Sequence, residues 1–170
     1  SDPATVTTTL TGVDDPPLIT NLTPALEGGE GIVDEDDLTD GSDTTKESLS
    51  TEGTSNISAP DGVDDLVVGG VTVIANGSYV GGTVTTPLGN QIVFTGYNAA
   101  TGELSYTYTL LDNEQHPTGD GQNSITDSVD VVLTDTDGDT DSDSLVVTIV
   151  DDVPTANDDS ITQTTENTSV

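Results

Sequence analysis

The charge of this chain constrains its fold more than any other feature of the sequence. Its 170 residues include 32 Asp and Glu but a single Lys or Arg, so the formal net charge at pH 7 is −31. In a compact domain like charges lie within about one Debye length of one another, roughly 8 Å at physiological salt, and they repel. Because Lys and Arg are too few to neutralise them, divalent cations are the remedy that remains.

The composition also excludes several classes of function. Nucleic acids and anionic membranes are bound through Lys and Arg, which are nearly missing here. The sequence has no Cys, so it can form neither disulfides nor thiolate metal sites. With one His and 3 % aromatic residues, it lacks most groups for acid–base catalysis and for stacking on sugars, and we expect no enzyme. No run of about 18 apolar residues is present, so we expect no direct membrane insertion.

The pattern of the hydrophobic residues, which make up 31 % of the chain, favours strands over disorder. Residues 104–110 read Leu-Ser-Tyr-Thr-Tyr-Thr-Leu, the period of two of a half-buried strand. Similar β-rich runs occupy 71–75, 91–95, 129–133 and 145–150, and turn signals separate them at 61–62, 69–70, 76–77, 81–82, 101–102 and 137–138. The pattern predicts an all-β antiparallel sandwich with no significant helix, in which the Tyr residues and Phe94 pack in the core or across strands.

A short sequence motif that occurs twice in the chain predicts the domain boundaries. Residues 13–17 (Val-Asp-Asp-Pro-Pro) and 150–154 (Val-Asp-Asp-Val-Pro) each follow a strand-like run. We interpret the chain as one unit of a tandem array, with the repeat at 13–153. Residues 1–12 would then be the end of the preceding repeat or a leading strand, and 154–170 a linker and the start of the next repeat.

Five segments carry a resemblance to a known family: 59–66, 102–117, 120–125, 133–140 and 150–156. Together they resemble the repeat (extender) domain of large type I-secreted, RTX-type bacterial adhesins, over roughly residues 12–156. The resemblance implies an immunoglobulin-like Greek-key sandwich, related to cadherin-like modules and dependent on Ca²⁺. Residues 155–170 resemble the opening of another cadherin-like repeat.

The function that the resemblance implies is structural. The expected module is an extender of a long adhesin on the bacterial cell surface, rigidified by several Ca²⁺ ions, which projects a distal adhesive region for surface attachment and biofilm formation. Its expected partners are neighbouring repeats of the same chain, and in isolation it would be a monomer. The alternative is a ligand-binding adhesin domain that grips sugar or protein in a concave, Ca²⁺-lined pocket open to solvent.

The first candidate cation site is the acidic run 135–143, with Asp135, Asp137 and Asp139 as the preferred ligands. Carboxylates two apart in a turn can converge on one Ca²⁺ ion, which takes six to eight oxygens. The run is not an EF-hand loop, because position twelve is Val146 where Glu is needed. We expect a turn between two strands, with the later Asp residues pointing to solvent. The alternative is a solvated acidic hairpin without an ion.

The second candidates lie at the two junctions, where the alternative is a flexible charged linker. They are Asp14 and Asp15 at the first junction, Asp151 and Asp152 at the second, and Asp158 and Asp159 just beyond it. By analogy with cadherin-like arrays, Glu27 and Glu166 would complete these sites between domains.

Weaker candidates lie elsewhere in the chain. Asp34 and Asp36 belong to the charge run 33–37, which has Asp40 and Asp43 nearby, and such a run is usually just solvated. Asp112 lies in a loop near His116 and Asp120, where the His is interpreted as a hydrogen-bonding loop residue in preference to a ligand. Asp61 and Asp64 flank a tight turn and are further possible ligands.

Overall fold

A computed structural model describes residues 14–22, 31–118 and 121–153 of the chain, and these form a two-sheet β-sandwich. The described residues contain eleven strands and one turn of 3₁₀ helix, η2 (Glu35–Asp37), so the prediction of an all-β sandwich is confirmed. None of them forms a helix of the length and apolarity needed to cross a membrane. The segments expected to belong to neighbouring repeats, 1–12 and 154–170, lie outside the described residues.

One sheet has five strands in the order β1-β3-β9-β8-β7, all antiparallel. Its strands are β1 (Leu18–Thr20), β3 (Ser50–Ser58), β7 (Gly82–Thr85), β8 (Gln91–Asn98) and β9 (Glu103–Thr109). The alternation predicted for 104–110 is borne out, because Leu104, Tyr106, Tyr108 and Leu110 are each at most 2 % exposed.

The second sheet has six strands in the order β2-β11-β10-β4-β5-β6. They are β2 (Ile32–Asp34), β4 (Val63–Val68), β5 (Val71–Ala75), β6 (Ser78–Tyr79), β10 (Ser124–Asp135) and β11 (Thr140–Val150). The pairing is antiparallel except between β2 and β11, which run parallel. This short pair departs from the predicted antiparallel pattern, because β2 is reached by crossing over from the other sheet and not through a hairpin.

The core lies between the two sheets and is filled by alternate residues of nearly every strand. From β10 and β11 it takes Val129, Val131, Leu133, Leu145, Val147 and Ile149, all at most 3 % exposed. Each such side chain contributes about 1.5–3 kcal/mol by leaving water. The aromatic prediction holds for Phe94, Tyr106 and Tyr108, which are buried, and the ring centroids of Phe94 and Tyr106 lie 6.3 Å apart. It does not hold for Tyr79, which is 37 % exposed and packs near the surface with its ring centroid 6.5 Å from that of Tyr97.

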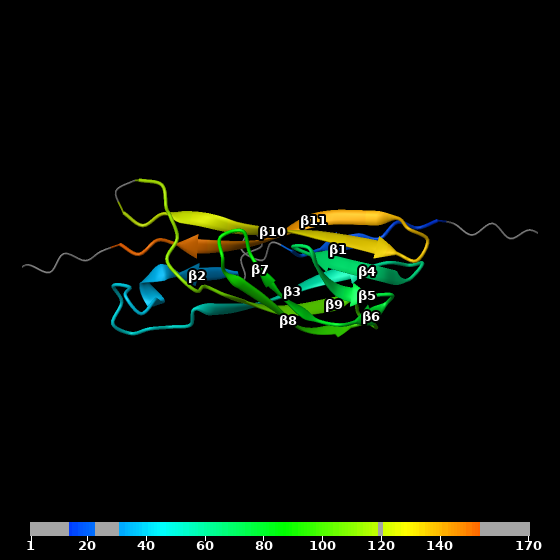
Figure 1. The fold of residues 1–170 in the computed structure, drawn as a ribbon, viewed down its shortest axis with the longest axis horizontal. Helices are drawn as coiled ribbons and strands as arrows, with labels where there is room; N and C mark the ends of the chain where they lie inside the picture. The colour runs from blue at the N-terminus through cyan, green and yellow to red at the C-terminus, as the bar shows by residue number, and fades with distance from the viewer. Residues whose placement is uncertain (1–13, 23–30, 119–120, 154–170) are drawn as a thin grey trace, which may run out of the picture.

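The sandwich is elongated, and the described chain begins and ends at opposite ends of it (Figure 1). We call the end that holds Asp14 and the β10–β11 turn the N-terminal pole. The end that holds η2, the β9–β10 loop and Val153 is the C-terminal pole. Because β10 and β11 run nearly the full length of the molecule, the turn between them and the exit from β11 lie at opposite poles (Figure 1).

Candidate cation sites at the two poles

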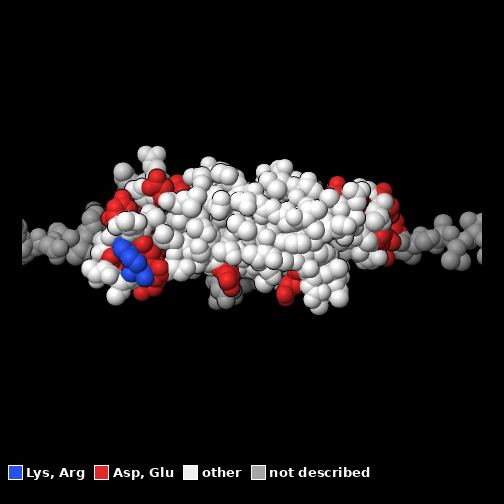
Figure 2. All heavy atoms as spheres, turned by 60° about the horizontal axis from the view of Figure 1, so that its bottom comes forward, with Lys and Arg blue, Asp and Glu red and all other residues white. Residues whose placement is uncertain are grey.

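Many acidic side chains gather at the two poles, and most of the surface between them carries no charge in the view of Figure 2, apart from acidic patches along its lower edge. Four groups of three potential ligands occur among the described residues, each with ligand atoms within 4.8 Å of one another. Two groups belong to the N-terminal pole (Asp135–Asp137–Asp139 and Asp14–Asp61–Asp137), and two to the C-terminal pole (Glu35–His116–Asp151 and Asp37–Asp43–Glu47).

At the N-terminal pole, the tight β10–β11 turn is organised by a buried carboxylate. Asp135 is 0 % exposed, and its Oδ1 accepts the backbone N–H groups of Gly138 at 3.0 Å and Asp139 at 2.8 Å. Its other oxygen, Oδ2, is buried and accepts no hydrogen bond from any described residue. A buried carboxylate oxygen without a hydrogen-bond donor destabilises the fold. A cation bound to this oxygen would remove that cost.

The incoming chain meets this turn. Asp14 and Asp61 bring their carboxylates within 4.8 Å of Asp137, and the N–H of Asp15 donates to Asp61 Oδ2 at 3.0 Å. The Asp61 segment is itself held against the turn, because Thr136 donates through its hydroxyl to the carbonyl of Asp61 at 2.5 Å. The topology thus brings three sequence-distant segments to one acidic cluster, which we call the turn cluster (Asp14, Asp61, Asp135, Asp137 and Asp139).

Crowding shifts the protonation of the turn cluster. Contact with the Asp135 carboxylate, followed by desolvation and contact with Asp14, raises the pKa of Asp137 to about 6. The charge of Asp14, followed by desolvation and the charge of Asp135, raises the pKa of Asp139. Burial alone would raise the pKa of Asp135, but its contact with Asp137 and the backbone N–H groups of the turn lower it overall. Without a cation, the cluster relieves its repulsion by holding a proton at pH values below about 6.

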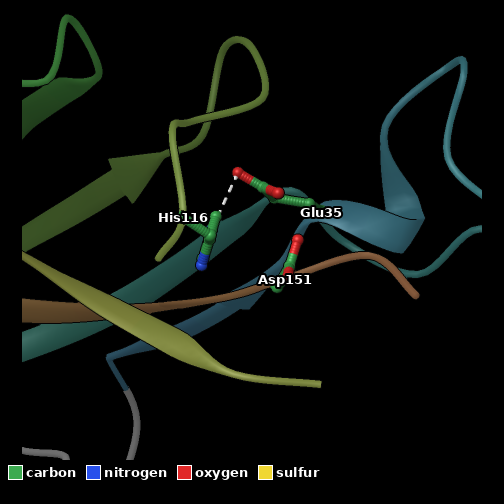
Figure 3. A group of neighbouring side chains, drawn as sticks. All are labelled: Glu35, His116 and Asp151. Atoms are coloured by element: carbon green, nitrogen blue, oxygen red, sulfur yellow. Dashed lines mark ion pairs between the residues drawn. The ribbon is translucent and has the colours of Figure 1, made fainter. Parts of the chain in front are cut away.

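At the C-terminal pole, three side chains from separate elements approach one another (Figure 3). Glu35 comes from η2, His116 from the β9–β10 loop, and Asp151 from the residues that follow β11. His116 Nε2 lies 3.3 Å from Glu35 Oε1, and both side chains are nearly buried at 5 % and 4 % exposure. The Glu35 carboxylate also accepts the N–H of Glu114 at 2.6 Å.

Two further acidic residues of this pole, Asp152 and Asp37, hold the loop after η2 in place. Asp152 accepts hydrogen bonds from the N–H of Ser42 at 2.9 Å and from its hydroxyl. Asp37 accepts the N–H of Glu47 at 2.6 Å, and contact with Asp37 raises the pKa of Glu47. Lys46, the only cationic side chain apart from His, donates to the backbone carbonyls of Asp36 and Gly41 and pairs with no described carboxylate.

Several predicted ligands belong to no three-residue group among the described residues. Asp34 caps η2 by accepting the N–H of Asp36 at 3.2 Å. Asp112 is exposed and, among the described residues, accepts only the N–H of its neighbour Asn113. Burial, followed by the charges of Asp34 and Asp37, raises the pKa of Asp36.

Other expectations are corrected or fall outside the described part. Asp141, expected to point to solvent, is half-buried and accepts the N–H of Ile19 at 2.7 Å, because β1 ends against the start of β11. Glu27, Asp120, Asp158, Asp159 and Glu166 lie outside the described residues. The ligand candidates that sequence reasoning missed are Glu35, Asp37 and Glu47; the first two stood in the noted charge run, but nothing in the sequence joined them to their partners.

Comparisons with known proteins found no family model, curated protein or solved structure that matches this chain.

Proposed function

We propose that this domain is a calcium-rigidified extender module of a long bacterial surface adhesin, with no enzymatic role. The observation that carries the proposal is the buried Oδ2 of Asp135, which accepts no hydrogen bond from the described residues and lies within the turn cluster. A Ca²⁺ ion binds carboxylate and carbonyl oxygens at 2.3–2.6 Å in flexible geometry. Such an ion would satisfy this atom and neutralise the neighbours that raise the pKa of Asp137.

The position of the turn cluster gives the ion a mechanical role. Asp14 belongs to the segment through which the chain arrives, whereas Asp135, Asp137 and Asp139 belong to the body of the sandwich. An ion shared among them fixes the incoming segment to the domain. Since the chain leaves at the opposite pole (Figure 1), units joined in tandem would extend end to end, and calcium outside the cell would stiffen each junction.

The alternative of a ligand-binding adhesin domain requires a concave, Ca²⁺-lined pocket. The acidic hollow at the C-terminal pole, lined by Glu35, Asp40, Asp151 and Asp152, holds only about 190 Å³, below the roughly 300–1,000 Å³ of a small-molecule site. A hollow of about 380 Å³ lies beside the N-terminal pole between Ile57, Gly62, Val63, Tyr97 and Gly102. Its lining contains no acidic residue, so it does not match the Ca²⁺-lined pocket that this alternative requires.

The calcium proposal is tested by thermal unfolding in calcium and in excess chelator. One site adds about 2.7 kcal/mol at a hundredfold excess of ligand over Kd. For a domain of this size, 1 kcal/mol shifts the midpoint by roughly 2–4 °C, so one ion adds about 5–11 °C and several ions add more. Asp137→Asn should lose much of the shift in calcium, while the exposed Asp143→Asn on β11 serves as a control of equal charge change. An unchanged midpoint in chelator would overturn the proposal.

A further inference from the structure

The group at the C-terminal pole differs from the turn cluster because it contains the only imidazole of the chain. Glu35, His116 and Asp151 each offer one ligand atom within 4.8 Å of the others (Figure 3). The two carboxylates also line a hollow of about 190 Å³ that gives a small ion a path to them. Both Glu35 and His116 are more than nine-tenths buried, so the group is built into the fold and is not a chance surface contact.

A single amide, that of Asn123, fixes the orientation of two of the three side chains. Its Nδ2 donates to Asp151 Oδ2 at 3.0 Å and to the carbonyl of Pro117 at 3.4 Å. Both acceptors require the amide nitrogen on that side, so Oδ1 faces His116 Nδ1 at 2.9 Å. Since the amide oxygen can only accept, the Nδ1 of the imidazole carries a hydrogen. A His that binds a metal through one ring nitrogen usually donates the N–H of the other to an oxygen acceptor, which fixes the ring orientation.

The other ring nitrogen is left facing negative charge. Nε2 of His116 is buried, makes no hydrogen bond with any described residue, and lies 3.3 Å from Glu35 Oε1. If the ring were protonated, its Nε2 proton would find no well-placed acceptor, because the contact with Glu35 Oε1 does not have hydrogen-bond geometry. If the ring is neutral, the Nε2 lone pair lies near a carboxylate oxygen, and the two repel each other. A cation between Nε2 and the two carboxylates removes both difficulties.

We propose that Glu35, His116 and Asp151 bind a late first-row divalent ion of the Zn²⁺ class, with water completing the coordination. Imidazole nitrogen suits Zn²⁺, Ni²⁺ and Cu²⁺, whereas Ca²⁺ prefers oxygen alone. The separation of 3.3 Å between Nε2 and Oε1 is roughly that of two ligands held about 2.0–2.1 Å from one tetrahedral zinc ion. The site would clamp the exit of β11 to η2 and to the β9–β10 loop.

The test uses the whole chain saturated with calcium, so that oxygen-only sites are filled before Zn²⁺ is added. Because the chain has one His, its imidazole carbon–proton signals in NMR report this site alone. We expect Zn²⁺ to shift these signals until one equivalent is bound and to cause no further change. Imidazole signals that do not respond to Zn²⁺ would show a His116–Glu35 pair without a metal and would overturn the proposal.

Single variants distinguish Zn²⁺ binding at these three residues from weak attraction of the ion to the negative charge of the whole domain. Glu35→Gln keeps an acceptor for the Glu114 N–H but removes a ligand charge, and Asn123→Ala removes the shared support. Each should weaken Zn²⁺ binding, measured by calorimetry in excess calcium, by about 10–100-fold. Asp112→Asn, in the same loop and with the same charge change as Glu35→Gln, should leave it unchanged. Equal weakening by Asp112→Asn and Glu35→Gln would overturn the proposal. The calcium dependence of unfolding is measured separately, so failure here leaves the proposed function untouched.

Discussion

The hydroxyl of Tyr108 donates a hydrogen bond of 2.8 Å to Asp127 Oδ2 across the core, and so joins the two sheets. Both residues are buried, Tyr108 at 0 % and Asp127 at 2 % exposure. Asn90 approaches the same carboxylate oxygen at 3.4 Å and donates to Glu114 at 2.8 Å. Burial, followed by the contact with Asp127, raises the pKa of Tyr108, so its hydroxyl stays protonated and available as a donor.

Replacing Tyr108 with Phe should therefore destabilise the domain. The change leaves the buried Asp127 carboxylate without its best donor, at an expected cost of about 1–3 kcal/mol. Urea unfolding at constant calcium measures the loss. Tyr97→Phe is the matched control, because Tyr97 is only partly buried and its hydroxyl makes no hydrogen bond with the described residues. If both variants are as stable as the parent chain, the bond across the core contributes nothing.

Gly102 is a second position where a small change should be costly. Its φ is +72°, and an added Cβ would lie 2.0 Å from the carbonyl oxygen of Ile57. The chain approaches closely here because Ile57 N–H donates to the Gly102 carbonyl at 2.9 Å. Gly102→Ala should lower the free energy of unfolding by more than about 1–2 kcal/mol. Gly96→Ala, where a Cβ meets open space and φ is not positive, should change it much less.

In chelator, the domain should become less stable as the pH rises from about 4 to 7. The unfolded pKa of Asp is about 3.9, and the pKa of Asp137 in the fold is raised to about 6 by Asp135, desolvation and Asp14. The native state therefore holds this proton more tightly than the unfolded state. The resulting stabilisation is fully present below the unfolded pKa and is lost as the pH passes through about 6.

This dependence can be measured by urea unfolding at a series of pH values in chelator. Asp137→Asn should flatten the fall, because the group that titrates is gone, whereas Asp143→Asn should leave it in place. A stability that rises over this range, in the parent chain without metal, would contradict the repulsion inferred for the turn cluster.

Junction stiffness is a separate prediction of the proposed function. Two copies of the chain joined in tandem should give small-angle scattering with a longer and better-defined maximum dimension in calcium than in chelator. Asp14→Asn in the second copy removes the ligand that the incoming segment supplies, and it should shrink that difference while both domains stay folded. Identical profiles in calcium and chelator, from folded domains, would reduce the junction to an ordinary linker.

The sequence predicted strands well where their inward residues are apolar, and less well elsewhere. β9 was predicted from its alternation, but β3 was not, because two of its inward positions are Gly53 and Ser55. Gly53 is needed there, since a Cβ would lie 2.3 Å from the ring of Tyr106. The need for a glycine at this position comes from Tyr106 on the neighbouring strand β9. The sequence around β3 therefore shows no alternation of apolar residues that would predict a strand.

The candidate sites also divide into those that a local sequence pattern predicted and those that depend on the folded structure. The spacing of Asp135, Asp137 and Asp139 placed them together because a tight turn is a local structure. The approach of Asp14 and Asp61 to that turn depends on the topology of the whole sandwich, and so does the meeting of Glu35 with His116. The interpretation of His116 as a hydrogen-bonding loop residue accounts for its Nδ1, which faces Asn123, and not for its Nε2.

The long β10–β11 hairpin has a consequence for a domain held at both ends. Eleven residue pairs join the two strands, and antiparallel hydrogen bonds run perpendicular to the strands they connect. Tension applied between Asp14 and Val153 pulls β11 along its own axis, because the chain leaves at the pole opposite the turn (Figure 1). The bonds of the hairpin are then loaded together in shear and cannot open one after another like a zipper. Mechanical resistance of this kind would suit the extender role proposed above.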